Sequence, residues 1–233
     1  MLHRLNSNDS PQFREIDMNL QLLAASVCTA SMLLGGASGC ATSENSTETA
    51  AGSSLGAQPG DRIDASSVTL RTASNSPVDL DMVLEDGPVV VVFYRGSWCP
   101  YCERALEGWD DQIDELNSAG GRLIALTPDA PNNVSETLTK QDLGFTVLSD
   151  ANGDAARALG INFVVDSATR SRYLGYGIDL EQSNASGLWQ LPHPGTFIID
   201  RDGTVRYANV SEDYLKGRAK PAEVIAAYRQ ITG

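Results

Sequence analysis

Apolar and polar positions alternate in readable patterns from about residue 62 onward. Pro88 introduces VVVVFY (residues 89–94), an unbroken run rich in β-branched residues, as expected of a strand buried on both faces. The segment ERALEGWDDQIDELNSAGG follows it, and its apolar residues recur at helical spacing opposite a row of acidic ones. These patterns predict a buried strand and then an amphipathic helix that ends at Gly120 and Gly121.

Further strand and helix candidates alternate along the rest of the chain. The strand candidates are 67–72, 122–127, 145–150, 196–200 and 204–210, and the helix candidates are 134–141, 151–159 and 221–231. Strands separated by helices imply βαβ units, so we expect an α/β fold with a central sheet and helices on both faces. Arg201-Asp202-Gly203 predicts a hairpin between the last two strands. Residues 167–192 show no clear period, and we expect an irregular excursion there.

The N-terminal region is typical of an export signal. Residues 20–37 are mostly apolar and uncharged and end in small residues. Ala37-Ser38-Gly39-Cys40 resembles a bacterial lipobox, in which the cysteine becomes a lipidated N-terminus. A plain cleaved signal and an uncleaved anchor are the alternatives. We expect a signal segment over 1–39, a flexible linker over 40–61 and a folded domain over 62–233, exported to the bacterial cell envelope or periplasm and lipid-anchored at Cys40.

Composition narrows the class of partner. The 233 residues carry a formal net charge of −13, with 42% hydrophobic and 20% charged residues. The acidic balance argues against nucleic acid, since phosphate binding needs clustered Lys and Arg. It equally argues against docking on anionic lipid, so membrane contact is expected only through the N-terminal lipid anchor.

Cys99 and Cys102 are the strongest candidates for chemistry. Of the four cysteines, Cys28 would leave with the signal and Cys40 would be acylated. The remaining pair forms a CxxC at a strand-to-helix junction, where the free N–H groups and positive dipole of a helix start stabilise a thiolate. We expect Arg95 to add positive potential and Trp98 to cover the sulfur.

The cysteine pair and its neighbours also allow other interpretations. A structural zinc site needs four ligands, and one CxxC with His193 does not supply them, so no metal is expected. A static disulfide is the plainer alternative to redox cycling, although so short a loop removes little unfolded-state entropy. His193 is either a proton carrier near the sulfurs or an ordinary loop histidine, and Trp189 is more simply a core residue than the wall of a substrate groove.

Two longer segments resemble a known family. VVVFYRGSWCPYCERAL and LPHPGTFIIDRDGTVRYANVSEDY are similar to the peroxiredoxin-like branch of the AhpC/TSA group (alkyl hydroperoxide reductase, thiol-specific antioxidant) within the thioredoxin superfamily. The resemblance implies a thioredoxin-like fold with a central mixed sheet and a redox-active Cys99–Cys102 disulfide. It also implies a hydroperoxide or protein-disulfide substrate, an external thiol reductant such as a thioredoxin-like protein, and no cofactor.

Counted from Phe93-Tyr94, the peroxidatic Cys of the family falls on Cys102. The chain departs from the family pattern at three positions, the first of which is Arg95 in place of Pro. Cys99 takes the place of the family's Thr, and Pro194 takes the place of its remote Arg. Pro194 instead matches the proline that thioredoxins hold in a cis bond opposite their CxxC. We therefore expect a thiol-disulfide oxidoreductase that reduces hydroperoxides or protein disulfides in an antioxidant role. The alternative is a non-catalytic thioredoxin-fold binding module with an inert disulfide, which a measured redox potential would distinguish.

Overall fold

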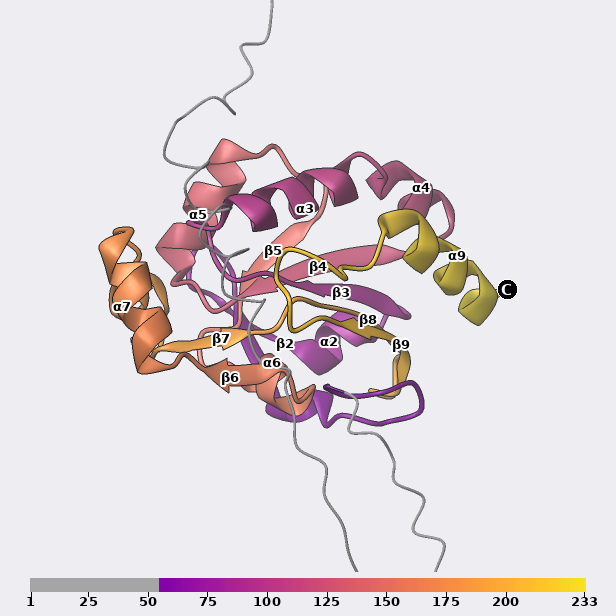
Figure 1. Cartoon of the computed structure of the whole chain (residues 1–233). Coiled ribbons are helices and arrows are strands. Elements are labelled where there is room, and N and C mark those ends of the chain that lie inside the picture. Colours follow the sequence, from indigo (N-terminus) through magenta and orange to yellow (C-terminus); the bar gives the residue numbers. More distant parts are fainter. Residues whose placement is uncertain (1–54) are drawn as a thin grey trace, which may run out of the picture. The chain divides into compact units, whose positions relative to one another are not determined.

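A seven-stranded mixed sheet forms the centre of the computed structural model, which describes residues 55–233 (Figure 1). Its strands are β1 (Thr69–Arg71), β2 (Pro77–Asp79), β3 (Val89–Phe93), β4 (Arg122–Thr127), β5 (Thr146–Ser149), β8 (Gly195–Ile199) and β9 (Val205–Val210). They lie in the order β2-β1-β5-β4-β3-β8-β9, with β3, β4 and β5 parallel to one another. The remaining pairs are antiparallel, including the β8–β9 hairpin that the sequence predicted.

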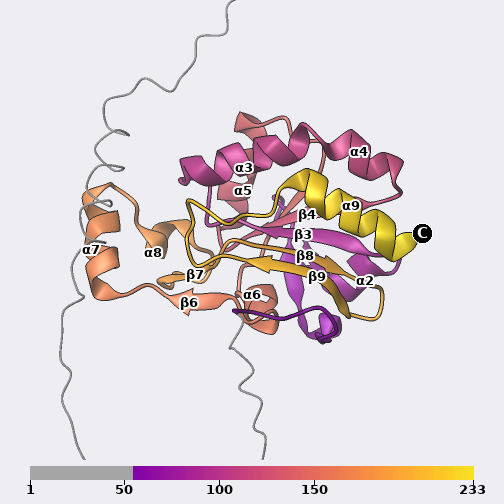
Figure 2. The same cartoon turned by 45° about the vertical axis from the view of Figure 1, so that its right-hand side comes forward.

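Helices cover both faces of this sheet, as the alternating pattern predicted (Figures 1 and 2). They are η1 (Ala65–Ser67), α2 (Leu80–Leu84), α3 (Pro100–Asp110), α4 (Ile113–Ser118), α5 (Pro131–Lys140), α6 (Asp154–Ala158) and α9 (Pro221–Thr232). Buried side chains of α3, α4, α5 and α9 pack on one face, and those of α2 and α6 pack on the other. Within residues 55–233, no helix combines the length and apolarity needed to cross a membrane.

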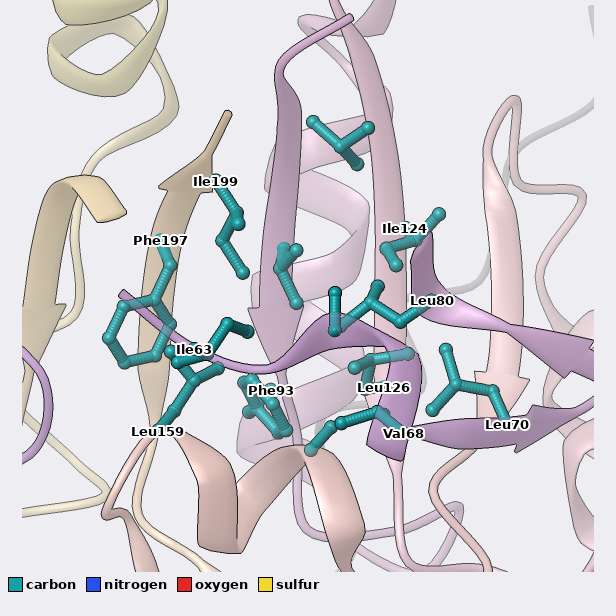
Figure 3. Close-up of a cluster of buried hydrophobic side chains, with 14 of the residues drawn as sticks. Ile63, Val68, Leu70, Leu80, Phe93, Ile124, Leu126, Leu159, Phe197 and Ile199 are labelled. Carbon is teal, nitrogen blue, oxygen red and sulfur yellow. The ribbon is translucent and has the colours of Figure 1, made fainter. Parts of the chain in front are cut away.

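Strand β3 is buried on both sides, which explains its unbroken apolar sequence. Val89, Val91 and Phe93 belong to the cluster drawn in Figure 3, where the Phe93 and Phe197 rings meet edge to face at a centroid distance of 6.1 Å. Val90 and Val92 point into the opposite cluster, which also contains both cysteines of the CxxC. The strand therefore anchors the cysteine loop in the middle of the core.

The predicted long amphipathic helix is divided into α3 and α4. The backbone of Gln112 leaves helical geometry (φ −121°, ψ 8°) between them. The apolar stripe nevertheless continues across the break, because Trp109 and Ile113 belong to the same buried cluster. The face that the sequence pattern assigned to the core is therefore correct, although the helix is not continuous.

The segment expected to be irregular contains regular structure. It holds α7 (Ser167–Gly175) and α8 (Leu180–Ser183), while β6 (Asn162–Val164) and β7 (Gln190–Pro192) pair as a separate antiparallel ribbon. The prediction of an irregular excursion was wrong because α7 buries no residue and so shows no apolar period. Its start is fixed instead by Asp166, whose side chain accepts two backbone N–H bonds. Trp189 packs in the small apolar cluster beneath these helices.

The described chain joins the fold before residue 62. The N–H of Ala57 donates to the carbonyl of Leu159 at 2.8 Å, and the N–H of Gly60 donates to that of Val205 at 2.8 Å. Residues 55–61, which the sequence assigned to the linker, therefore contact the domain. The expected signal over 1–39, the lipidation site Cys40 and the rest of the linker lie outside the described residues.

Candidate functional site

Cys99 and Cys102 lie at the start of α3, just after strand β3, as the sequence predicted. Cys99 is the residue that caps α3, and Pro100 occupies the first turn, where its missing N–H leaves no hydrogen bond unmade. The two cysteines form a disulfide with a Cα–Cα distance of 5.3 Å. The N–H of Cys102 donates to the Cys99 sulfur at 3.3 Å. This helix start thus directs a backbone donor at the first sulfur of the pair.

Arg95 approaches the same sulfur from the loop that follows β3. Its Nη2 donates to the Cys99 sulfur at 3.3 Å, and its Nη1 donates to the Tyr173 hydroxyl at 2.8 Å. The guanidinium also lies 3.8 Å from the ring centroid of Tyr214, and only 6% of the residue is exposed. Burial lowers the pKa of Arg95 from its ordinary value. The expected positive potential is therefore present and directed at Cys99.

A second arginine, Arg218, contacts the other sulfur. It comes from the segment between β9 and α9, and its Nη2 lies 3.6 Å from the Cys102 sulfur. Burial, with the nearby charge of Arg95, lowers the pKa of Arg218 to about 10. Within residues 55–233, neither arginine has a carboxylate at ion-pair distance. Each sulfur therefore has its own uncompensated cation, and each cation would stabilise a thiolate there.

Aromatic side chains from three segments pack around the loop that carries the cysteines. Both cysteines are 0% exposed in the disulfide form. Trp98 meets Tyr173 of α7 edge to face at 5.6 Å, and Tyr101 of α3 meets Tyr214 at 5.8 Å. Trp98 thus packs beside the cysteines as expected. The two tyrosines from distant segments had no signature in the sequence, because an isolated tyrosine in an aperiodic segment does not reveal what it contacts.

A buried carboxylate, Asp129, hydrogen-bonds to the loop between β3 and α3. It is 0% exposed, and its Oδ2 accepts the N–H of Ser97 at 2.7 Å. Its Oδ1 has no hydrogen-bond partner, and burial raises the pKa of Asp129 to about 6. The chain passes so closely here that a Cβ on Gly96 would lie 2.8 Å from that oxygen. Gly96 and Asp129 therefore fix the path of the loop that presents Arg95 and Cys99.

Pro194 differs from the interpretation drawn from sequence, whereas His193 fits one of the two alternatives that the sequence left open. No peptide bond among residues 55–233 is cis, so the expected cis bond before Pro194 is wrong. The carbonyl of Pro194 is instead engaged within the molecule, since it accepts the N–H of Ser211 at 3.0 Å. The His193 ring stacks on Phe163 of β6 at 4.4 Å, and burial lowers its pKa. His193 thus packs against the small ribbon, as an ordinary loop histidine does.

The site contains the elements of dithiol chemistry. Two sulfurs at bonding distance can store and release two electrons, and adjacent cations lower the cost of forming the nucleophilic thiolate. In the part of the chain that the structure describes, no three His, Cys, Asp or Glu residues cluster as a metal site would require.

Comparison with known proteins gives a consistent result. The model of the AhpC/TSA family matches residues 62–208. Peroxiredoxin Bcp of Escherichia coli (strain K12) is 28% identical over 119 residues, which are 51% of this chain and 65% of that protein. A bcp relative from Haemophilus influenzae is 32% identical over 73 residues, 31% of this chain and 47% of that protein. The chain therefore spans about half to two thirds of these curated relatives.

Solved structures show the same fold. The crystal structure of peroxidoxin BcpB from Mycobacterium tuberculosis aligns with a TM-score of 0.60 at 22% sequence identity. The alignment covers 76% of this chain and 99% of that one. The mixed sheet with helices on both faces is thus a thioredoxin-like fold of the kind that peroxiredoxins have.

Proposed function

This chain belongs to the AhpC/TSA family, and on that premise we propose that it is a peroxiredoxin-like thiol peroxidase that cycles Cys99 and Cys102 between dithiol and disulfide. One observation supports this proposal above the others: each sulfur of the buried pair has its own arginine, without a competing carboxylate among the described residues. An inert structural disulfide would gain nothing from one buried and one half-buried cation, each without a carboxylate partner in the described part of the chain. Their placement is useful only where a sulfur becomes anionic.

The proposed cycle has three steps. The Cys99 thiolate attacks the O–O bond of a hydroperoxide, becomes a sulfenic acid and releases an alkoxide, which takes up a proton to leave as an alcohol. The Cys102 thiol condenses with the sulfenic acid, forming the disulfide and releasing water. Two thiols of an external protein then reduce the disulfide and are themselves oxidised to a disulfide.

Although the resemblance places the family's peroxidatic Cys on Cys102, we assign Cys99 as the nucleophile from its hydrogen-bond donors. Its sulfur accepts from Arg95 Nη2 and from the Cys102 N–H, both at 3.3 Å, whereas the Cys102 sulfur has the longer 3.6 Å contact to Arg218. More donors to the charged form stabilise the thiolate more strongly.

Burial favours a small oxidant over a protein disulfide. Both cysteines are 0% exposed beneath aromatic side chains, so a folded protein could reach the sulfurs only after this cover is displaced. A hydroperoxide is small enough to enter after side-chain rearrangement alone. A thioredoxin-like reductant needs local opening, and we expect that regeneration is slower than peroxide reduction.

Stopped-flow kinetics of the reduced protein test this function. Equimolar hydrogen peroxide, an organic hydroperoxide or insulin is mixed with the protein, and thiol loss is followed. We expect fast oxidation by at least one hydroperoxide and slow insulin reduction. Slow reaction with both peroxides and fast insulin reduction would instead identify a disulfide reductase, and inertness toward all three would support the binding-module alternative.

Single cysteine variants test the assignment of the nucleophile. Cys102→Ser should still consume one equivalent of hydroperoxide and accumulate a sulfenic acid on Cys99 that dimedone traps, as mass spectrometry would show. Cys99→Ser should lose fast peroxide consumption. Trapping on Cys102 in the Cys99→Ser protein, at the wild-type rate, would reverse the assignment.

We also propose export and a lipid anchor at Cys40. The apolar run over 20–37 and the following Ala37-Ser38-Gly39-Cys40 support this proposal. Mass spectrometry of the protein from a bacterial host should find an acylated Cys40 at the mature N-terminus. Cys40→Ser should abolish acylation and release the protein from the membrane fraction, and an unprocessed N-terminus would contradict the proposal.

A further inference from the structure

A cavity of about 260 Å³ lies between α3, the start of β8 and the segment before α9. Val92, Trp109 and Pro194 form part of its apolar wall. Arg218 also lines it, and this is the arginine whose Nη2 contacts the Cys102 sulfur. One side chain therefore joins the cavity to the redox pair.

The charge of the cavity is opposite to that of the molecule. Arg104, Arg218 and Lys220 line it, and no carboxylate does, although the chain has a net charge of −13. Lys220 is largely exposed and pairs with Glu223 at 3.2 Å. Arg218, in contrast, is half-buried and has no carboxylate partner among the described residues. A desolvated guanidinium without a counter-ion is a ready partner for an anion.

We infer that this cavity binds a small organic anion, a carboxylate with an apolar tail, whose carboxylate pairs with Arg218 while its tail lies against Val92 and Trp109. The bidentate geometry of a guanidinium suits a carboxylate, and the apolar wall suits a short hydrocarbon chain. The ligand needs no peroxide group, so its binding does not depend on the proposed peroxidase activity.

Arg218 couples this binding to the redox state of the cysteines. In the disulfide form the Cys102 sulfur 3.6 Å from Arg218 is uncharged, so it competes only weakly with a carboxylate for the guanidinium. In the reduced form a thiolate at Cys102 competes for the same guanidinium. The anion should therefore bind the oxidised protein more tightly, by about fivefold or more, and this coupling rests on the pair being redox-active.

Titration calorimetry on the full-length protein tests the inference. The probes are hexanoate, acetate, hexanol and hexylammonium, added to the oxidised protein. We expect hexanoate to bind at least about tenfold more tightly than acetate, which lacks the tail, and than hexanol, which lacks the charge. Hexylammonium should show no binding. Equal affinity for hexanoate and hexanol would overturn the inference, as would equal affinity for hexanoate and acetate.

Two substitutions distinguish the contributions of charge and cavity. Arg218→Gln should weaken hexanoate binding about tenfold, while the matched control Arg206→Gln, an exposed arginine on β9, should leave it unchanged. Gly108→Leu tests the cavity without touching a charge. Gly108 lines the cavity in α3, and a Cβ there meets no atom within 4 Å, so leucine should fill the space and fold normally.

Undiminished hexanoate binding in Gly108→Leu would place the ligand outside this cavity and would contradict the inference. Repeating the titration on reduced protein measures the coupling. Binding that is tight in both redox states would keep the site but disprove its link to Cys102, whereas failure of peroxide reduction with binding intact would count only against the proposed function.

Discussion

At the scale of single residues, the site is dominated by charges that lack ordinary partners. Arg95 and Arg218 are cations beside sulfur, and Asp129 is a buried carboxyl with one oxygen unbonded. Such groups are costly to bury, and they persist where they position or activate a neighbour. Their individual contributions can therefore be measured by substitution.

Asp129 should make the folded protein less stable as the pH rises through its titration. Because burial raises its pKa to about 6, the native carboxyl keeps a proton that the unfolded chain loses near pH 4. Stability therefore falls between about pH 4 and 6. Asp129→Asn retains an acceptor for the Ser97 N–H but cannot ionise. In urea unfolding it should be about 2 kcal/mol more stable than wild type at pH 7.5 and equal to it at pH 4.

A matched comparison isolates this effect. Asp111→Asn, which changes an exposed carboxylate at the end of α3, should show the same stability as wild type at both pH values. If Asp129→Asn were less stable than wild type at pH 7.5, an ionised Asp129 would be a necessary acceptor and the raised pKa would be refuted.

Arg95 should set the reactivity of Cys99. Replacing it by Gln removes the positive charge 3.3 Å from the sulfur, so the pKa of the Cys99 thiol should rise and the rate of peroxide reduction at pH 7 should fall about tenfold. Thiolate absorbance near 240 nm and stopped-flow rates measure the two effects. Arg95→Lys keeps a charge and should recover part of the rate. An unchanged titration in Arg95→Gln would show that the helix start alone activates Cys99.

Sequence alone located half of this site. Cys99, Cys102, Arg95 and Trp98 were predictable because they are neighbours in one strand-to-helix junction, where spacing determines position. Arg218 was not predicted, because it is 116 positions from Cys102 and meets it only through the fold. The remaining contacts of the site, which the sequence did not show, are Asp129, Tyr173 and Tyr214.

At the scale of elements, α7 is held by its capped start and by side chains that reach outward, Tyr173 and Arg170, of which Arg170 pairs with Glu181 and lies 4.7 Å from the Trp189 ring. None of its residues is buried, and Tyr173 is its link to the site through Arg95 and Trp98. A helix with so little buried area is expected to open more easily than the sheet. Such opening would be the route by which a reductant reaches the sulfurs.

Removing the cap of α7 should loosen this helix without unfolding the domain. Asp166→Ala deletes the oxygen that accepts the N–H groups of Ala168 and Thr169, each at 2.9 Å. The loss of this cap destabilises the helix, so hydrogen exchange of the α7 amides should become about fivefold faster. The global unfolding midpoint should not move, since α7 contributes no buried side chain. A fall in that midpoint matching the faster exchange would show that α7 unfolds only with the whole domain.

Helices and strands with a buried apolar pattern were predicted from the sequence, and those without one were missed. Strands β3, β4 and β8 and helix α9 were predicted because each has an apolar pattern imposed by the core. The short β2 and α2 were missed, since three-residue and five-residue elements contain too few positions to show a period. Capping rather than burial defines α7, and caps are weaker sequence signals than apolar stripes.

At the scale of the whole molecule, redox state and stability are linked. Among residues 55–233 the two cations have no counter-ion in the disulfide form, and in the reduced form they should stabilise a thiolate where the unfolded chain keeps a protonated thiol near neutral pH. When a group loses its proton at a lower pH in the folded protein than in the unfolded chain, the folded protein becomes more stable as the pH rises. The folded reduced protein should therefore benefit from alkaline conditions more than the oxidised one.

Urea unfolding of both forms between pH 6 and 8 checks this linkage. The unfolding free energy of the reduced form, minus that of the oxidised form, should increase by about 1 kcal/mol or more over that range. Asp129 contributes equally to both forms and cancels in the difference. Parallel stability curves for the two forms would mean that neither sulfur is ionised in the folded reduced protein.

The position of residues 55–61 on the domain affects how a lipid-anchored form would be oriented at a membrane. Ala57 packs against the cluster on one side of the sheet, while Cys99 and Cys102 belong to the cluster on the other. In a chain lipidated at Cys40, only residues 41–54 would connect the lipid to the domain, and they span at most about 50 Å when fully extended. The domain would then be attached to the bilayer from the face of the sheet opposite the cysteines. The redox pair would face the surrounding fluid, where soluble oxidants and reductants diffuse.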